Sequence, residues 1–144
     1  MQSDPISQHL IADGYLLEPR RLNPQNPDSA FLGWHFTRKN AEYIFRALEG
    51  TTDTLIIPYY GMIDPQKRQT LGSGFTGLLW FAHYVRDADC GIRFLTACIH
   101  HDPAKYPWSL SHERMKAYYL RMGCRIERRD IQYDWVIYPV VGVK

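Results

Sequence analysis

The spacing of apolar residues along the chain predicts helices that alternate with strands. The clearest helix follows residue 74, where five apolar residues recur at helical spacing on one face: Phe75, Leu78, Leu79, Ala82 and Val85. A second such face lies nearer the C-terminus and consists of Met115, Tyr118, Tyr119 and Met122. Ser111 is placed to cap the start of this later helix, and Gly123 is placed to end it. A short amphipathic helix is predicted over residues 4–13, before Gly14.

Strand patterns occupy much of the remaining chain, over residues 31–37, 41–48, 54–63, 92–99 and 133–140. Segment 41–48 also fits a helical face, but its short flanking turns favour a strand, which makes the first three strands an antiparallel meander. Segments 54–63 and 92–99 flank the helix after residue 74, so this crossover unit predicts that they run parallel. We therefore expect an α/β protein with a mixed sheet, folded as a single domain over residues 1–144.

Composition narrows the class of protein. The 144 residues are 45% hydrophobic and 14% aromatic, which suits one domain with a real core. We expect residues 1–30 to form the N-terminal helix and a Pro-rich surface loop over 18–29, and residues 31–144 to form the core. A net charge of +2 does not indicate a nucleic-acid binder. The Arg125, Arg128 and Arg129 cluster is interpreted as a solvated turn.

The cysteines and the termini indicate the compartment. Three cysteines without a C-x-x-C pair predict neither a disulfide framework nor a zinc site. The N-terminus lacks a basic, apolar signal run, and no stretch approaches the roughly 18 apolar residues of a spanning helix. These features predict a cytoplasmic protein with no membrane span.

A glycine-rich turn directly precedes the predicted helix at Phe75. It reads Gln69-x-x-Gly72-x-Gly74, with Lys67 and Arg68 as a cationic rim. A helix that begins on such a turn offers unpaired amide groups and its positive dipole end to phosphate, and glycine lets the backbone approach an anion closely. A plain loop with an N-cap has the same pattern. The turn matches neither a P-loop nor the dinucleotide fingerprint, and we interpret it as a pyrophosphate cradle.

This turn resembles the Gln/Arg-x-x-Gly-x-Gly/Ala motif of GNAT acyltransferases, in which backbone amides hold the pyrophosphate of acyl-CoA. The run Ala117-Tyr118-Tyr119-Leu120-Arg121-Met122-Gly123-Cys124 is similar to the late GNAT helix, and both motifs stand in the GNAT order. The resemblance covers roughly residues 31–140. It implies a GNAT-like fold and acetyl-CoA or another acyl-CoA as cofactor, without a metal. The cofactor-binding residues it implies are Arg68, Gln69, Leu71, Gly72, Ser73, Gly74 and Phe75.

The GNAT resemblance also implies a break in the sheet beside the cofactor. In that fold the strand before the glycine turn carries a bulge and parts from the next parallel strand, leaving backbone groups free for the pantetheine arm. Pro58 lies inside segment 54–63 and donates no ladder hydrogen bond, so we expect a break in pairing there. A simple edge strand accounts for the proline equally well.

Catalytic residues are less completely specified. Tyr119 matches the GNAT tyrosine that often serves as general acid for the departing thiolate, although a core aromatic residue is the alternative reading. GNAT enzymes commonly place a glutamate base on the strand before the glycine turn, and segment 54–63 contains none. Four residues are substitutes among which the spacing does not choose: Glu49, Asp64, His100 and His101.

A narrower resemblance covers nearly the whole chain. Asp4-Pro5-Ile6, Leu10 before Gly14, Ala30-Phe31-Leu32 and above all Ser109-Leu110-Ser111-x-x-Arg114-Met115-x-x-Tyr118-Tyr119-x-Arg121 look like the LcrR family of type III secretion regulators. That resemblance implies an accessory role exercised through protein partners of a secretion system. We thus expect a GNAT-fold regulatory protein that retains an acyl-CoA site. The alternatives are an acyl-CoA-dependent N-acyltransferase and a binding module with an empty cradle.

Overall fold

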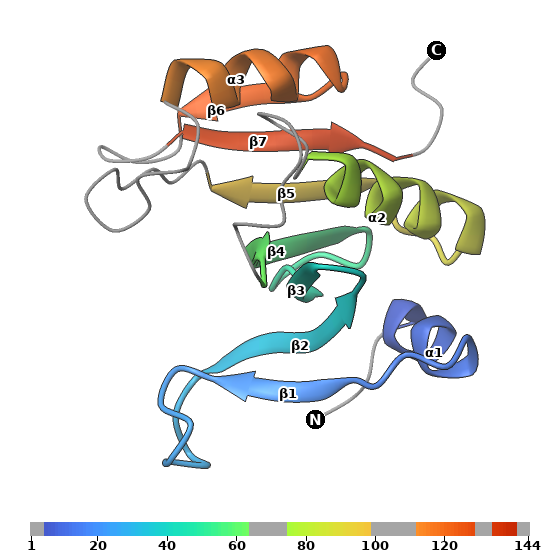
Figure 1. Cartoon of the computed structure of the whole chain (residues 1–144), viewed down its shortest axis with the longest axis vertical. Helices are drawn as coiled ribbons and strands as arrows, with labels where there is room; N and C mark the ends of the chain where they lie inside the picture. Colours follow the sequence, from blue (N-terminus) through green and yellow to red (C-terminus); the bar gives the residue numbers. More distant parts are fainter. Residues whose placement is uncertain (1–4, 64–74, 99–111, 129–133, 141–144) are drawn as a thin grey trace.

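The computed structural model describes residues 5–63, 75–98, 112–128 and 134–140 of the chain (Figure 1). The elements in chain order are α1 (Pro5–Ala12), β1 (Glu18–Arg21), β2 (Phe31–Arg38), β3 (Ala41–Ala47), β4 (Thr54–Met62), α2 (Phe75–Ala88), β5 (Phe94–Cys98), α3 (His112–Arg121), β6 (Arg125–Arg128) and β7 (Asp134–Pro139). Segment 41–48, which fitted either a helix or a strand, is the strand β3.

The strands form one mixed sheet in the order β1-β2-β3-β4-β5-β7-β6. Strands β2, β3 and β4 are the predicted antiparallel meander. Strand β4 pairs with β5 in parallel, and α2 makes the crossover between them. The predicted fold class, an α/β protein with a mixed sheet and one crossover unit, is confirmed.

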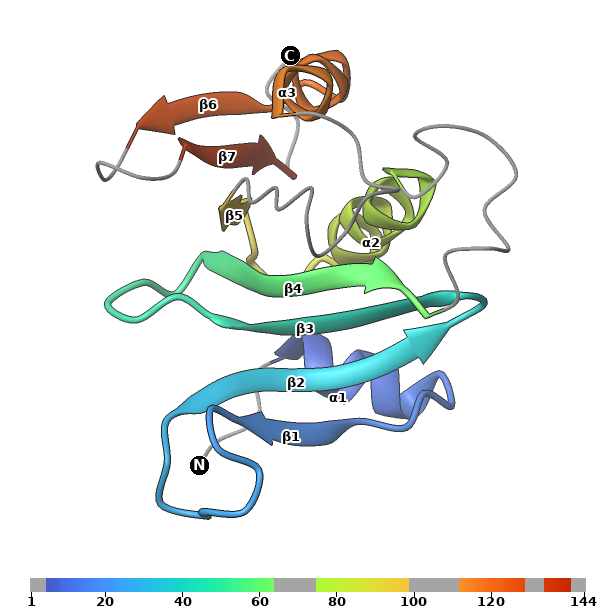
Figure 2. The same ribbon diagram turned by 60° about the vertical axis from the view of Figure 1, so that its left-hand side comes forward.

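The described helices cover one face of the sheet. Side chains of α1 and α2 share a fully buried core cluster with the meander strands, and this cluster includes Ile6, Leu10, Phe36, Tyr43, Phe45, Leu55, Phe81 and Val85. Tyr119 of α3 belongs to a smaller cluster around Cys124 and Val136. Ala97 and Tyr138 pack against both clusters, so α3 lies on the same side of the sheet as α1 and α2 (Figure 2).

The face that α2 buries differs in part from the predicted one. Ala82 and Val85 are buried as expected, and Leu78 packs against the core. Phe81, which lies outside the predicted face, is fully buried, whereas Leu79 is only partly buried. Phe81 is three residues after Leu78 and four before Val85, so it shares the buried face of the helix with them, and its ring removes a large apolar surface from water.

Two edge strands were missed by the sequence reading. Residues 18–21 were predicted as loop but form β1, in which Pro19 lies opposite Trp34 of β2. Proline is tolerated there because β1 is an edge strand. The arginine cluster predicted as a turn begins with β6, which pairs with β7 and packs Ile126 into the smaller cluster. Both predictions were wrong because short edge strands carry charges and proline that also mark loops.

No helix among the described residues is long and apolar enough to cross a lipid bilayer.

Candidate functional site

Strands β4 and β5 pair over a short stretch and then part. Their parallel ladder has three rungs, from Thr54–Phe94 to Ile56–Thr96. Beyond Ile56, β4 continues to Met62 against β3 alone, while β5 continues to Cys98 against β7 (Figure 2). Within the described part of the chain, no strand pairs with the β5 side of β4 after Ile56. An extended ligand that lies beside this side of β4 would take the place of a neighbouring strand.

A bulge lies where the strands part. Two steps along β3, from Ile44 to Arg46, match three steps along β4, from Tyr59 to Ile56. One extra residue is therefore inserted in β4 around Pro58. The predicted break in pairing is confirmed, and the alternative of a simple edge strand is wrong, because β4 has a neighbour on each side.

The predicted cofactor cradle falls mostly outside the described residues. Arg68, Gln69, Leu71, Gly72, Ser73 and Gly74 belong to that part of the chain, as do Lys67 and Asp64. Helix α2 begins at Phe75, the residue at which the glycine turn was expected to open a helix, although the Phe75 side chain is not described. The cradle thus stays a prediction.

Tyr119 lies on α3, within the smaller core cluster. Burial, and to a lesser extent the neighbouring Cys124, raise the pKa of its phenol above the ordinary range. Tyr60 of β4 is close enough for Tyr119 to contribute to the raised pKa of Tyr60, after burial and the charge of Tyr43. One phenol, that of Tyr60, thus belongs to β4. The other, that of Tyr119, belongs to α3, the helix that packs on β5 and β7.

A tyrosine pair that the sequence reading missed lies against the first turn of α2. Tyr43 and Tyr60 are partners in the β3–β4 ladder, and their ring centroids lie 5.0 Å apart. The Tyr43 hydroxyl donates a hydrogen bond to the Gly77 carbonyl oxygen at 3.0 Å. A Cβ atom at Gly77 would lie 2.3 Å from the Tyr60 hydroxyl and 2.8 Å from the Tyr43 hydroxyl. A larger residue fits here only if these hydroxyls shift, and a glycine inside a helix pattern was the available signal.

The cationic side chain of Arg38 lies next to this tyrosine pair. Burial raises the pKa of the Tyr43 phenol to about 12, although the charge of Arg38 and hydrogen bonding from it act to lower that pKa. The Arg38 guanidinium carbon lies 4.2 Å from the centroid of the Trp80 ring. Arg38 and Trp80 thus bring a cation and an indole next to the tyrosine pair.

Four residues were suggested in place of the missing glutamate base. Glu49 is exposed in the β3–β4 turn, at the end of β4 where that strand still pairs with β5. It therefore lies at the end of the sheet opposite to the one where β4 and β5 part. Asp64, His100 and His101 lie outside the described residues.

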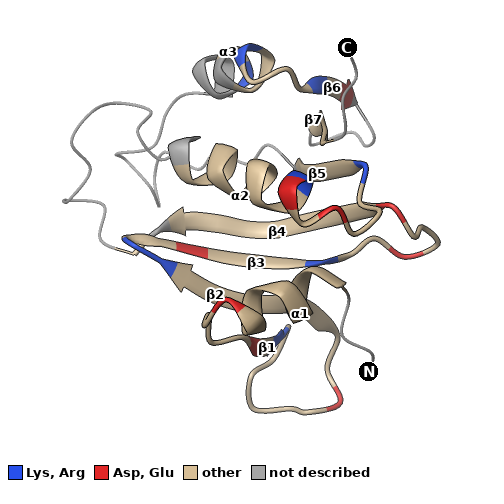
Figure 3. Cartoon of the chain, turned by 90° about the vertical axis from the view of Figure 1, so that its right-hand side faces the viewer, with Lys and Arg blue, Asp and Glu red and all other residues tan. Residues whose placement is uncertain are grey.

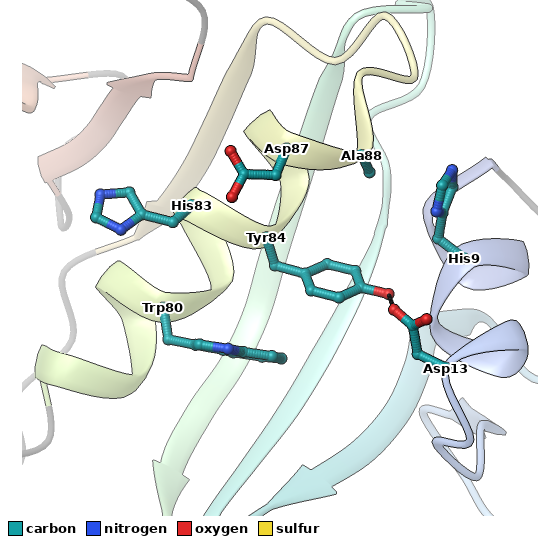
Figure 4. A pocket seen from close by; sticks show the side chains of 7 residues that line it. All are labelled: His9, Asp13, Trp80, His83, Tyr84, Asp87 and Ala88. Carbon is teal, nitrogen blue, oxygen red and sulfur yellow. Dashed lines mark hydrogen bonds between the residues drawn. The ribbon is translucent and has the colours of Figure 1, made fainter.

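A groove between α1 and α2 is a separate feature. It is lined by His9, Asp13, Trp80, His83, Tyr84, Asp87 and Ala88, and encloses about 290 Å³ (Figure 4). The Tyr84 hydroxyl donates a hydrogen bond of 2.5 Å to the Asp13 carboxylate. Burial and then this carboxylate raise the pKa of Tyr84. Over the described residues, no group of three or more His, Cys, Asp or Glu side chains is arranged to hold a metal.

The parallel pair and the bulge at which its strands part are features that the GNAT resemblance implied. Among solved structures, the chain is similar to a protein assigned as a GNAT-family acetyltransferase from Desulfovibrio desulfuricans, with 18% identity over 95% of this chain and 77% of that one, at a TM-score of 0.49. It is also similar to an acetyltransferase from Thermus thermophilus, with 16% identity over 92% and 69% of the two chains, at a TM-score of 0.45.

A third similar structure is a mutant AtaT toxin bound to the C-terminus of the antitoxin AtaR and to acetyl-CoA. It shares 14% identity over 94% of this chain and 73% of that one, at a TM-score of 0.42. No protein-family model and no curated protein matches the sequence. Likeness at this level does not carry a function from those proteins to this chain, and none of these similarities bears on type III secretion.

Proposed function

We propose that the chain binds an acyl-CoA in the opening between β4 and β5 and transfers the acyl group to an amine. The observation that carries this proposal is the parting of an internal parallel pair after three rungs, with a bulge in β4 at the same place. Two parallel strands are held together by their ladder, so a ladder that ends after three rungs inside a sheet leaves room for another partner. An extended ligand with amide groups, such as pantetheine, has the shape and the hydrogen-bonding groups to add to that side of β4.

Helix α2 supplies the second half of the proposed site. It begins at Phe75, so the amides of its first turn lack helical partners. A pyrophosphate at this end gains those amides as donors and the favourable end of the helix dipole. Arg68, Gln69, Leu71, Gly72, Ser73, Gly74 and Phe75 are the residues that we assign to this contact.

The proposed reaction is nucleophilic attack by an uncharged amine on the thioester carbonyl carbon. A C–N bond forms, the C–S bond breaks, and the leaving thiolate accepts the phenolic proton of Tyr119. A phenol is protonated near neutrality even at its ordinary pKa of about 10, and burial raises the pKa of Tyr119 further. No carboxylate lies on β4 to take the proton of the amine, so we assign that proton to solvent in the present scheme.

Calorimetric titration of acetyl-CoA into the purified protein tests the proposal. Gly72→Glu would place a side chain and a negative charge in the cradle, and we expect saturable binding in the native protein that is lost in this variant. Leu16→Glu is the matched control, because it adds the same charge at a position that is 77% exposed. Absence of binding at millimolar acetyl-CoA, or equal loss in both variants, would overturn the cofactor assignment.

A regulatory role in type III secretion is the second candidate, and its support is the LcrR-like run from Ser109 to Arg121. Most of that run either precedes α3 or has undescribed side chains, so the role stays a prediction. Deletion of the gene should change the secretion or expression of secretion components if protein partners of that system are its targets. Normal secretion in the deletion strain argues against this role and leaves the acyl-CoA proposal untouched.

A further inference from the structure

We propose that Arg38 binds an oxyanion, a carboxylate or a phosphate, carried by one of the two substrates. This inference rests on the proposed function and adds a specificity residue to it. Arg38 and Lys39 form a basic corner of the sheet, and nothing in the sequence motifs pointed to it.

The basic corner lies at the open end of the sheet. Arg38 is the last residue of β2 and pairs with Ala41, which in turn pairs with Met62 at the end of β4. This is the end toward which β4 runs after it leaves β5. Figure 3 shows basic residues at the β2–β3 turn, on the side of the molecule where α2 begins.

The Arg38 guanidinium lies beside an indole and a phenol. Its central carbon lies 4.2 Å from the centroid of the Trp80 ring, on α2. It is also a hydrogen-bonding neighbour of the Tyr43 hydroxyl, which donates a 3.0 Å hydrogen bond to the Gly77 carbonyl oxygen. A planar guanidinium that stacks on an indole keeps its edge donors available for bidentate contact with a carboxylate or phosphate.

Arg38 is partly buried and has no acidic partner in the described parts of the chain. The ion pairs there join Arg20 to Glu18, Arg86 to Asp87 and Arg125 to Glu127. Glu42, the nearest acid along the ladder, bonds to His35 at 3.1 Å instead. It pairs with Thr37, so its side chain points to the opposite face of the sheet from Arg38.

This arrangement favours an anionic ligand. Aromatic rings and a hydroxyl stabilise a cation but leave its charge uncompensated, and a partly desolvated guanidinium gains most from a charged acceptor. The positive charge of Lys39 next to it increases that preference. Asp13 accepts a hydrogen bond from Tyr84 and forms no ion pair with Arg38.

Two substrates of the proposed reaction carry such a group. The phosphates of the CoA moiety are one source, and the carboxylate of an amino-acid acceptor is the other. Arg38→Gln removes the charge and keeps a polar side chain of similar reach, whereas Arg38→Lys keeps the charge and removes the planar fork. Arg86→Gln is the control, because Arg86 is exposed, lies on α2 and pairs only with its neighbour Asp87.

The first measurement is the affinity of each protein for CoA, 3′-dephospho-CoA and pantetheine by calorimetry. If CoA phosphate is the ligand, Arg38→Gln weakens CoA binding by about tenfold or more, as expected for a lost charged hydrogen bond, and leaves pantetheine binding unchanged. Arg38→Lys should recover part of the loss. A general loss of structure would instead weaken all three ligands equally and lower the unfolding temperature.

The second measurement uses acetyl-CoA with a panel of amino acids and their carboxamides as acceptors. If the acceptor carboxylate is the ligand, Arg38→Gln raises KM about tenfold or more for the acids and not for the amides. Native protein that binds no acyl-CoA overturns the proposed function. The inference about Arg38 alone is overturned if the native protein binds CoA but Arg38→Gln binds every CoA analogue equally well and shows no selective loss with the acids. If the native protein binds CoA and no acceptor in the panel is acetylated, equal binding of the CoA analogues by Arg38→Gln is enough to overturn it.

Discussion

Gly77→Ala is the perturbation that tests the packing between α2 and the tyrosine pair. At a solvent-exposed position inside a helix, this change stabilises a protein by about 1 kcal/mol, because alanine has a better helix propensity than glycine. Here the new Cβ would lie 2.3 Å from the Tyr60 hydroxyl and 2.8 Å from the Tyr43 hydroxyl. Tyr43 is fully buried and stacks on Phe36 with centroids 4.6 Å apart, so its ring has little room to withdraw.

The magnitude follows from three opposing contributions. Overpacking a well-packed core costs about 1–3 kcal/mol, and displacement of the Tyr43 hydroxyl from the Gly77 carbonyl costs about 1 kcal/mol more. After the propensity gain is subtracted, we expect Gly77→Ala to lower the free energy of unfolding by about 1–3 kcal/mol. In a domain of this length, each kcal/mol lowers the midpoint temperature by about 2–4 °C.

Urea unfolding followed by circular dichroism at 25 °C measures the change. Tyr60→Phe removes the closest atom, so the cost of Gly77→Ala should be smaller in a Tyr60→Phe background, and the double-mutant cycle gives the coupling between the two positions. His83→Ala, at an exposed position of the same helix, is the control for propensity alone. A Gly77→Ala protein as stable as the native one, or more stable, would refute the placement of the two hydroxyls.

Three further outcomes follow from the buried phenols and thiol. Tyr119→Phe should lower kcat about 100-fold or more while leaving the Kd for acetyl-CoA unchanged, and an unchanged kcat removes Tyr119 as the acid. Burial raises the folded-state pKa values of Tyr43, Tyr60 and Tyr119, so their stabilising contribution is complete below about pH 10 and is lost above it. Urea midpoints should therefore fall between about pH 10 and about pH 12, and a flat profile contradicts this reasoning. Burial also raises the pKa of the Cys124 thiol to about 12, so iodoacetamide at about pH 8 should alkylate Cys90 before Cys124, as read by peptide mass spectrometry.

Much of the architecture could be predicted from the sequence, because the hydrophobic periodicity and the turn residues indicate the same elements along the central strands. The segment that contains Pro58 shows this agreement best. A strand pattern, a crossover helix beginning at Phe75 and a proline in mid-strand together predicted a parallel pair with a break, and the structure has both. The edge strands β1 and β6 were not accessible, because their charged and proline residues carry the same signal as loops.

The candidate site divides along a similar line. Tyr119 was singled out because helix spacing and a family pattern coincide on it, and its catalytic role stays a prediction. Arg38, Tyr43 and Tyr60 were not found, because their neighbours come from β2, β3, β4 and α2 and no short sequence window contains them. Gly77 was a local signal, because a glycine inside a helix usually has a packing or functional reason. Only the fold shows that the hydroxyls of Tyr43 and Tyr60 occupy the space next to it.

The open side of β4 also bears on where the binding energy comes from. Pro58 and Tyr59, at the bulge, are exposed. A ligand amide that pairs there exchanges one hydrogen bond for another, and each such exchange is worth only about 0.5–1.5 kcal/mol. In the proposed complex, the anionic end of an acyl-CoA would lie at the N-terminus of α2, where the helix dipole makes a stronger contact with a charged group. Under this proposal the parted strands set the ligand's position and direction, whereas its affinity depends chiefly on contacts to its charged groups.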